Sequence, residues 1–111
     1  MTQDELLVSS RRRGPTIVWF VELGDDLYIR SVNGRGAAWF RGVLETHEGT
    51  ISIGGVERDV AFEETTEHAD ALDAAYREKY AREPRQYVDA INSAEARAAT
   101  LRVVPRGQET R

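Results

Sequence analysis

Hydrophobic and polar positions fall along the chain in short runs whose spacing changes from strand-like to helix-like and back. Residues 16–22 are β-branched and aromatic, with apolar side chains on both faces, which predicts a strand buried on both sides. Gly24, Asp25 and Asp26 are turn residues, and residues 27–32 then alternate as a second strand. The two runs together predict an antiparallel hairpin.

A second hairpin is predicted further along the chain. Residues 50–53 and 56–63 have strand patterns, and the dipeptide Gly54-Gly55 between them suits the positive φ angles of a tight turn. Residues 100–104 form one more predicted strand near the end of the chain.

Three segments have helical spacing. Residues 37–46 predict a short helix, and residues 94–99 another that Ser93 caps. The clearest helix begins after Thr65 or Thr66 and ends before Pro84. Its predicted buried stripe is Ala69, Leu72, Tyr76 and Tyr80.

This order of elements predicts an α+β fold with a mainly antiparallel sheet that curls toward a barrel. The order does not favour a parallel Rossmann sheet, because that fold needs repeated strand–helix alternation. We expect a flexible N-terminal arm over residues 1–15, a barrel domain over residues 16–105 and a polar tail over residues 106–111.

Composition narrows the function classes. The chain has no cysteine, so disulfides, zinc–thiolate sites and iron–sulfur clusters are excluded. Its net charge of −4 argues against a nucleic-acid partner. We find no signal peptide and no apolar run long enough for a membrane span, so we predict a cytoplasmic protein without a membrane partner. The 14 arginines beside a single lysine reflect either genomic base composition or the recognition of an anion by forked guanidinium groups.

A glycine-rich segment is the main candidate for chemistry. Gly34 and Gly36 flank Arg35 between a predicted strand and a helix. The N–H groups of such a turn, with a helix N-terminus, form a nest for an anion, and Arg35 and Arg41 would add charge-assisted hydrogen bonds. The alternative is a plain connection in which the glycines make the turn and Trp39 fills the core.

Residues 11–80 resemble the deazaflavin-dependent nitroreductase branch of the flavin-binding split barrels. The resemblance rests on a basic, glycine-containing loop at residues 11–14, an acidic turn at residues 24–26, and a glycine loop that leads to the Trp39-Phe40 pair on a helix. The chain is also similar to an uncharacterised family of short bacterial proteins that end in a Thr-Leu-Arg-Val-Val-Pro strand.

The resemblance implies a split β-barrel that binds flavin mononucleotide (FMN) or a deazaflavin. It further implies an oxidoreductase that transfers hydride to a small molecule, and a homodimer, which the two apolar faces of residues 17–21 also favour. The cofactor supplies the chemistry in such enzymes, so no acid–base pair is required and catalytic residues are not assigned. The residues that it assigns to the cofactor or its pocket are Arg12, Arg13, Ser31, Asn33, Arg35 and Trp39, and the anion nest argued above adds Arg41 as a candidate for cofactor binding.

Two other functions remain open. A cofactor-free barrel could bind a small anionic or aromatic ligand or catalyse a non-redox step, and an interaction module would need no pocket. His47 and His68 are isolated, with acidic neighbours, so we read them as surface groups and expect no metal site.

Overall fold

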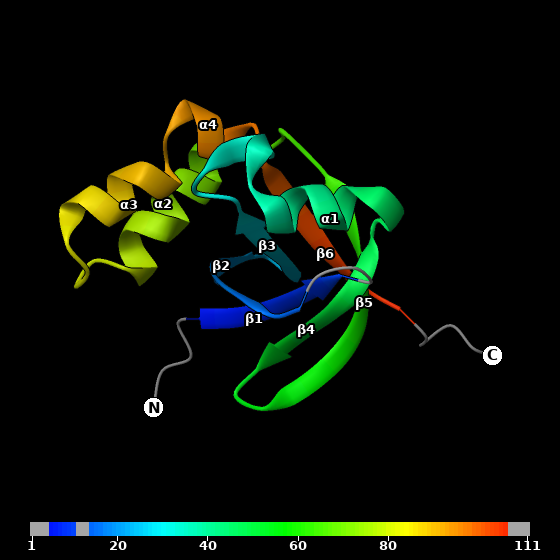
Figure 1. Cartoon of the computed structure of the whole chain (residues 1–111). Coiled ribbons are helices and arrows are strands. Elements are labelled where there is room, and N and C mark those ends of the chain that lie inside the picture. The colour runs from blue at the N-terminus through cyan, green and yellow to red at the C-terminus, as the bar shows by residue number, and fades with distance from the viewer. Residues whose placement is uncertain (1–4, 11–13, 107–111) are drawn as a thin grey trace.

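Six strands form a closed antiparallel barrel in the order β1-β2-β3-β6-β5-β4 (Figure 1). The structure is a computed structural model of the whole chain, and it describes residues 5–10 and 14–106. The strands are β1 (Glu5–Ser10), β2 (Thr16–Leu23), β3 (Asp26–Arg30), β4 (Glu48–Ile53), β5 (Val56–Glu64) and β6 (Thr100–Pro105). The helices are the 3₁₀ turn η1 (Gly34–Gly36), α1 (Ala38–Thr46), α2 (Ala69–Lys79), α3 (Arg85–Ile91) and α4 (Ala94–Arg97). The predicted α+β fold with a mainly antiparallel barrel is confirmed.

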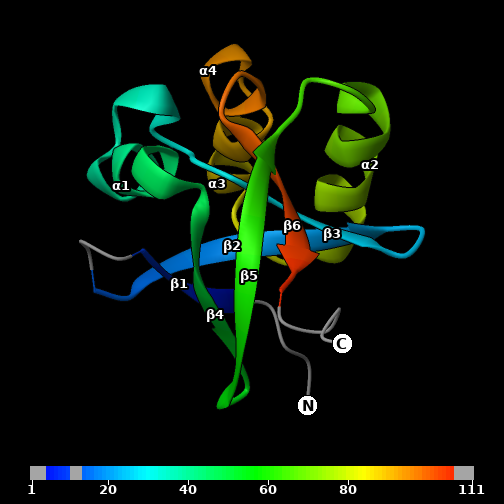
Figure 2. The same ribbon diagram turned by 90° about the vertical axis from the view of Figure 1, so that its right-hand side faces the viewer.

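The helices gather on one side of the barrel. Figure 2 shows α1 and α2 on opposite flanks, with α3 and α4 between them, and in both Figures 1 and 2 the β4–β5 hairpin extends away from the helices. Within the described residues, no helix has the length and apolar content needed to cross a membrane.

The prediction of an N-terminal arm is wrong for residues 5–10, which form β1. This strand pairs with β2 on one side and β4 on the other, and it closes the barrel. Leu6 and Val8 are each 1% exposed and point into the core, whereas Leu7 between them is exposed. Three apolar residues suffice for a strand here because neighbouring strands supply the rest of the pairing.

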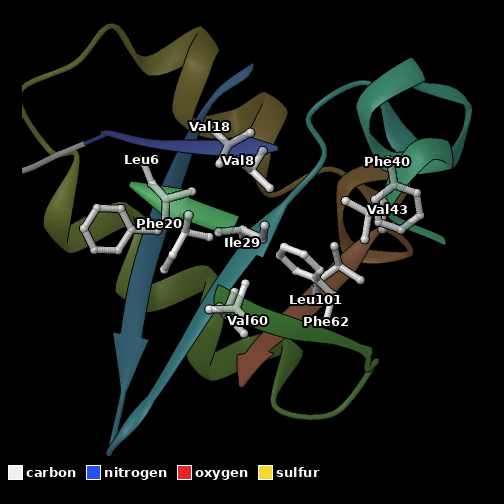
Figure 3. Close-up of a cluster of buried hydrophobic side chains, with 13 residues drawn as sticks. Leu6, Val8, Val18, Phe20, Ile29, Phe40, Val43, Val60, Phe62 and Leu101 are labelled. Atoms are coloured by element: carbon white, nitrogen blue, oxygen red, sulfur yellow. The ribbon is translucent and has the colours of Figure 1, made fainter. Parts of the chain in front are cut away.

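The barrel encloses the main hydrophobic core (Figure 3). Phe40 and Val43 of α1 lie at one end of this cluster and cover it. Trp39 is half-buried and packs against the same cluster from outside. Helix α1 therefore places one aromatic side chain in the core and its neighbour at the surface.

A second hydrophobic cluster lies outside the barrel, between β2, β3 and the helices α2 and α3. Its buried members are Val21, Tyr28, Leu72, Tyr76, Tyr80, Val88 and Ile91. Strand β2 is therefore covered on both faces toward its C-terminal end, as the pattern predicted. At its N-terminal end Ile17 is 60% exposed, because no helix covers that part of the strand.

The second half of the chain departs from the predicted helices. Helix α2 begins at Ala69, after His68 in a left-handed conformation, rather than directly after Thr65 or Thr66. Residues 85–91 form α3, which we had not predicted, and Pro84 is its N-cap residue. Pro84, which the sequence predicted to end one helix, instead lies at the start of the next. The predicted cap of α4 is confirmed, since Ser93 Oγ accepts a hydrogen bond from the Ala96 amide.

Candidate ligand-binding site

A pocket of about 310 Å³ opens on the outer face of the barrel, between α1 and α3. Residues 16–19 of β2 line it, together with Val32 and Asn33 after β3. Trp39 of α1 and Tyr87 of α3 add aromatic surface from the two helices. Because Trp19 is among the β2 residues, both tryptophans of the chain line this pocket.

The rim of the pocket is unusually apolar for a protein surface. Ile17, Val32 and Tyr87 line the pocket and are 60%, 43% and 54% exposed. Leu7, at 37% exposed, is the cross-strand partner of Ile17. These are four of the five exposed large hydrophobic side chains in the described part of the chain, and we call them the apolar rim. Such a gathering is typical of a binding surface.

Trp19 is held in place by the aromatic side chain behind it. Its ring stacks on Tyr80, with the centroids 4.1 Å apart and the planes 5° from parallel. Tyr80 is 1% exposed, its hydroxyl donates to the Phe20 carbonyl at 2.8 Å and accepts from the Phe20 amide at 3.0 Å. The C-cap residue of α2 thus fixes the wall of the pocket through the backbone of β2.

Arg30 forms a buried hub at the inner wall of the pocket. Its side chain is fully buried, and it donates to Asp73 Oδ1 at 2.7 Å, to Thr100 Oγ1 at 3.1 Å and to the Ile91 carbonyl at 3.2 Å. Asn92 Oδ1 accepts a further bond at 3.0 Å. These bonds tie β3 to α2, to the end of α3 and to β6, so they set where the α3 wall of the pocket stands.

Asp73 neutralises this hub. It is 3% exposed and lies between Arg30 and Arg97, each of which donates to one of its carboxylate oxygens. Burial on its own would raise the pKa of Asp73. The hydrogen bonds from Arg97 and Arg30 outweigh burial and hold the pKa below its ordinary value.

Of the residues predicted for a cofactor site, the pocket brings together Asn33 and Trp39. Ser31 lies nearby in the chain but is fully buried, and its hydroxyl donates to the Gly34 carbonyl at 2.7 Å. The Gly34 amide donates to the Ser31 carbonyl at 2.9 Å, so some of the hydrogen-bonding groups of the turn's backbone are already paired within the turn. Ser31 therefore shapes the glycine turn and does not line the pocket.

The predicted arginines are placed differently. Arg35 Nη1 lies 2.8 Å from Glu64 Oε1 and donates to the Ala98 carbonyl at 3.0 Å, and its side chain does not line the pocket. The hydrogen bond from Arg35 is the main reason that the pKa of Glu64 is lowered. Arg41 is exposed on α1 and is also absent from the lining. Arg12 and Arg13 lie outside the described residues.

The described side chains that line the pocket are mostly apolar or aromatic. The described residues that line it include no carboxylate, histidine or lysine, and the one arginine among them is Arg30, which is already bonded. In residues 5–10 and 14–106, no group of three or more histidine, aspartate or glutamate side chains could hold a metal ion. A reaction in this pocket would depend on the chemistry of the bound molecule itself.

Several lining residues were missed by the sequence analysis. Tyr87 and Ile91 belong to α3, which was not predicted, and Ile17 was expected to be buried. One available signal was the tyrosine at position 87, three residues after a proline that can begin a helix.

Comparison with known proteins yields a family but no characterised relative. No curated protein matches the chain. A family model described as "Uncharacterized protein conserved in bacteria (DUF2255)" matches residues 1–103, which is nearly the whole chain. The chain therefore belongs to this uncharacterised bacterial family.

Proposed function

We propose that this protein binds the ring system of a flavin or a deazaflavin in the pocket between α1 and α3, and that it is a small oxidoreductase acting by hydride transfer on a small molecule. The observation that carries the proposal is a pocket of about 310 Å³ lined by both tryptophans. This volume is at the low end of the ~300–1,000 Å³ of ligand sites. It suits one flat ring system and leaves the rest of a nucleotide outside.

The described residues suit the ring of such a cofactor better than its phosphate. The apolar walls, Trp19 and Trp39, suit the ring, and Asn33 is a polar group at the same pocket. The phosphate end has less support, because Arg35 is already paired with Glu64. We propose that Arg12 and Arg13 bind the phosphate, since they shortly precede the lining residue Thr16 in the chain.

Hydride transfer would be the chemistry of the bound cofactor. The side chains described here would bind and orient the ring and exclude water from one of its faces. This division of labour agrees with a pocket lining that has no carboxylate, histidine or lysine among the described residues.

The second candidate is a cofactor-free barrel that binds a small aromatic molecule. The Arg35–Glu64 ion pair favours it, because this pair engages the arginine on which phosphate binding was expected to depend. An apolar pocket without an available cation would take an uncharged ring rather than a nucleotide. The two candidates differ in whether a phosphate adds to the affinity.

We also propose that the protein is a homodimer in which a second copy covers the apolar rim. The rim is continuous with the mouth of the pocket, so pairing there would enclose a bound ring more fully. A standard interface removes about 800 Å² per partner from water, and the rim would form the apolar centre of such a patch.

The test is a fluorescence titration of the protein with riboflavin, FMN and a deazaflavin at two salt concentrations. The cofactor proposal expects binding of the ring in all three, and tighter, salt-sensitive binding when a phosphate is present. Binding of riboflavin and FMN with equal affinity would favour the cofactor-free candidate. Absence of binding for all three would refute the proposed site.

A pair of matched variants locates the binding. Ile17→Glu places a charge on the pocket rim, whereas Val56→Glu places the same charge on an equally exposed strand residue outside the pocket, at 53% exposure. We expect Ile17→Glu to weaken riboflavin binding at least tenfold, since the pocket loses apolar contact and gains a solvated charge. Val56→Glu should bind as the parent does.

A further inference from the structure

We propose that Trp19, Tyr80 and Tyr76 form a preformed π-stacked wall, and that this wall makes the pocket select electron-poor planar aromatic ligands over electron-rich ligands of the same shape. This inference rests on the proposed function only in requiring that the pocket binds an aromatic ring. It goes further by naming the electronic class of that ring and the side chains that select it.

The three rings form a continuous stack that begins at the pocket. Trp19 and Tyr80 lie face to face, with centroids 4.1 Å apart and planes 5° from parallel. Tyr76 continues the stack behind Tyr80, at 5.9 Å and 22°. Trp19 is the member that lines the pocket, and the two tyrosines are buried at 1% exposure or less.

Hydrogen bonds from the two tyrosines to β2, the strand that carries Trp19, fix the positions of the stacked rings. The Tyr80 hydroxyl bonds to both the amide and the carbonyl of Phe20. The Tyr76 hydroxyl donates to the carbonyl of Trp19 itself at 3.2 Å. Neither tyrosine can move away without breaking a hydrogen bond to β2, so the indole wall exists before any ligand arrives. A preorganised wall saves the ordering cost of binding.

The geometry leaves part of the indole for a ligand. Tyr80 covers one face of Trp19, and Trp19 is half-buried and lines the pocket. Indole and phenol rings are electron-rich, with negative faces. A ligand ring whose own face is negative is therefore attracted more weakly when it lies flat on the indole than a ring from which electron density has been withdrawn.

The experiment uses two probes of similar size, 3-cyanoquinoline and 3-aminoquinoline, at a mildly alkaline pH where both are uncharged. The cyano group withdraws electron density from the ring and the amino group donates it. Dissociation constants are measured by calorimetry for the parent protein. We expect cyanoquinoline to bind about threefold to tenfold more tightly, the range that aromatic pair energies allow.

Three variants assign the preference to the wall. Trp19→Leu keeps an apolar surface but removes the indole, and it should bring the ratio of the two dissociation constants close to one. Trp39→Leu changes the other tryptophan of the pocket, which is in edge contact with Phe40 rather than stacked, and should weaken both probes while keeping the ratio. Tyr80→Phe keeps the ring but loses the hydroxyl, so it should keep most of the preference.

The ratio of the two dissociation constants distinguishes a loss of selectivity from a loss of folded protein, because a general loss of structure would weaken the binding of both probes alike. Equal affinity of the parent for the two probes would overturn the proposed wall, as would a ratio that survives Trp19→Leu. Binding of riboflavin with no preference between the quinolines would remove this inference alone. Failure of the parent to bind riboflavin and both quinolines would remove the proposed function as well.

Discussion

Removing the carboxylate of Asp73 should be among the most destabilising single changes in this protein. Asp73 is 3% exposed and provides the anionic partner of Arg30, whose side chain is fully buried 2.7 Å away. In Asp73→Ala the guanidinium keeps its acceptors on Thr100, Ile91 and Asn92 but loses its counter-charge. Leaving one member of a buried ion pair without its partner costs about 3–5 kcal/mol.

Because several neutral acceptors remain for Arg30, we expect a loss near 3 kcal/mol, the lower end of that range. For a domain whose total stability is about 5–15 kcal/mol, this is a large fraction. The assay is urea denaturation followed by tryptophan fluorescence, and the midpoint should fall while the slope stays constant.

Asp70→Ala is the matched control. Asp70 lies on the same helix and pairs with the same Arg97, at 3.7 Å, but it is fully exposed. Its removal should leave the midpoint unchanged, since an exposed pair contributes little. If Asp73→Ala and Asp70→Ala gave the same midpoint, the reasoning about the buried hub would be refuted.

The same carboxylate gives a pH dependence with a definite sign. The pKa of Asp73 is lower in the folded protein than its ordinary value of about 3.9. The unfolded chain therefore binds the proton first, and the contribution of Asp73 to stability is complete above about pH 4 and falls as the pH drops through the folded-state pKa. Comparing the parent with Asp73→Ala across this range isolates the effect. The stability difference between them should shrink as the pH falls, and a difference that grew would contradict the assignment.

The remaining predictions concern packing and assembly. A Cβ at Gly49 would collide with the carbonyl oxygen of Ser9 on the neighbouring strand, so Gly49→Ala should destabilise the barrel by about 1–3 kcal/mol in the same urea assay, whereas Gly36→Ala, where a Cβ meets nothing, should fold as the parent does. The apolar rim predicts a dimer mass by light scattering at micromolar concentration, and Tyr87→Glu should shift it toward one chain because a charge then has to be buried; a parent that runs as one chain would exclude the dimer. Arg35→Ala should not weaken riboflavin binding, because Arg35 is bonded to Glu64 and Ala98 outside the pocket, and a tenfold loss would show that this arginine turns toward the ligand.

Local patterns in the sequence determined much of the barrel. The hairpin of β2 and β3 and the hairpin of β4 and β5 were both predicted from strand periodicity and the turn residues between them. The buried stripe of α2 was also predicted, and Leu72, Tyr76 and Tyr80 are buried as expected. These features depend on side chains that are close in sequence, so period and turn chemistry are sufficient to specify them.

The tertiary structure decided how these pieces close and where a ligand could bind. Strand β1 is a strand only because β2 and β4 lie beside it, and β4 is some forty positions away in the chain. Arg35 looked available for an anion in the sequence, yet a distant residue, Glu64, engages it. The pocket itself needs Trp19, Trp39 and Tyr87 from three separate elements. Contacts between residues far apart in sequence leave no local period, so only the folded chain reveals them.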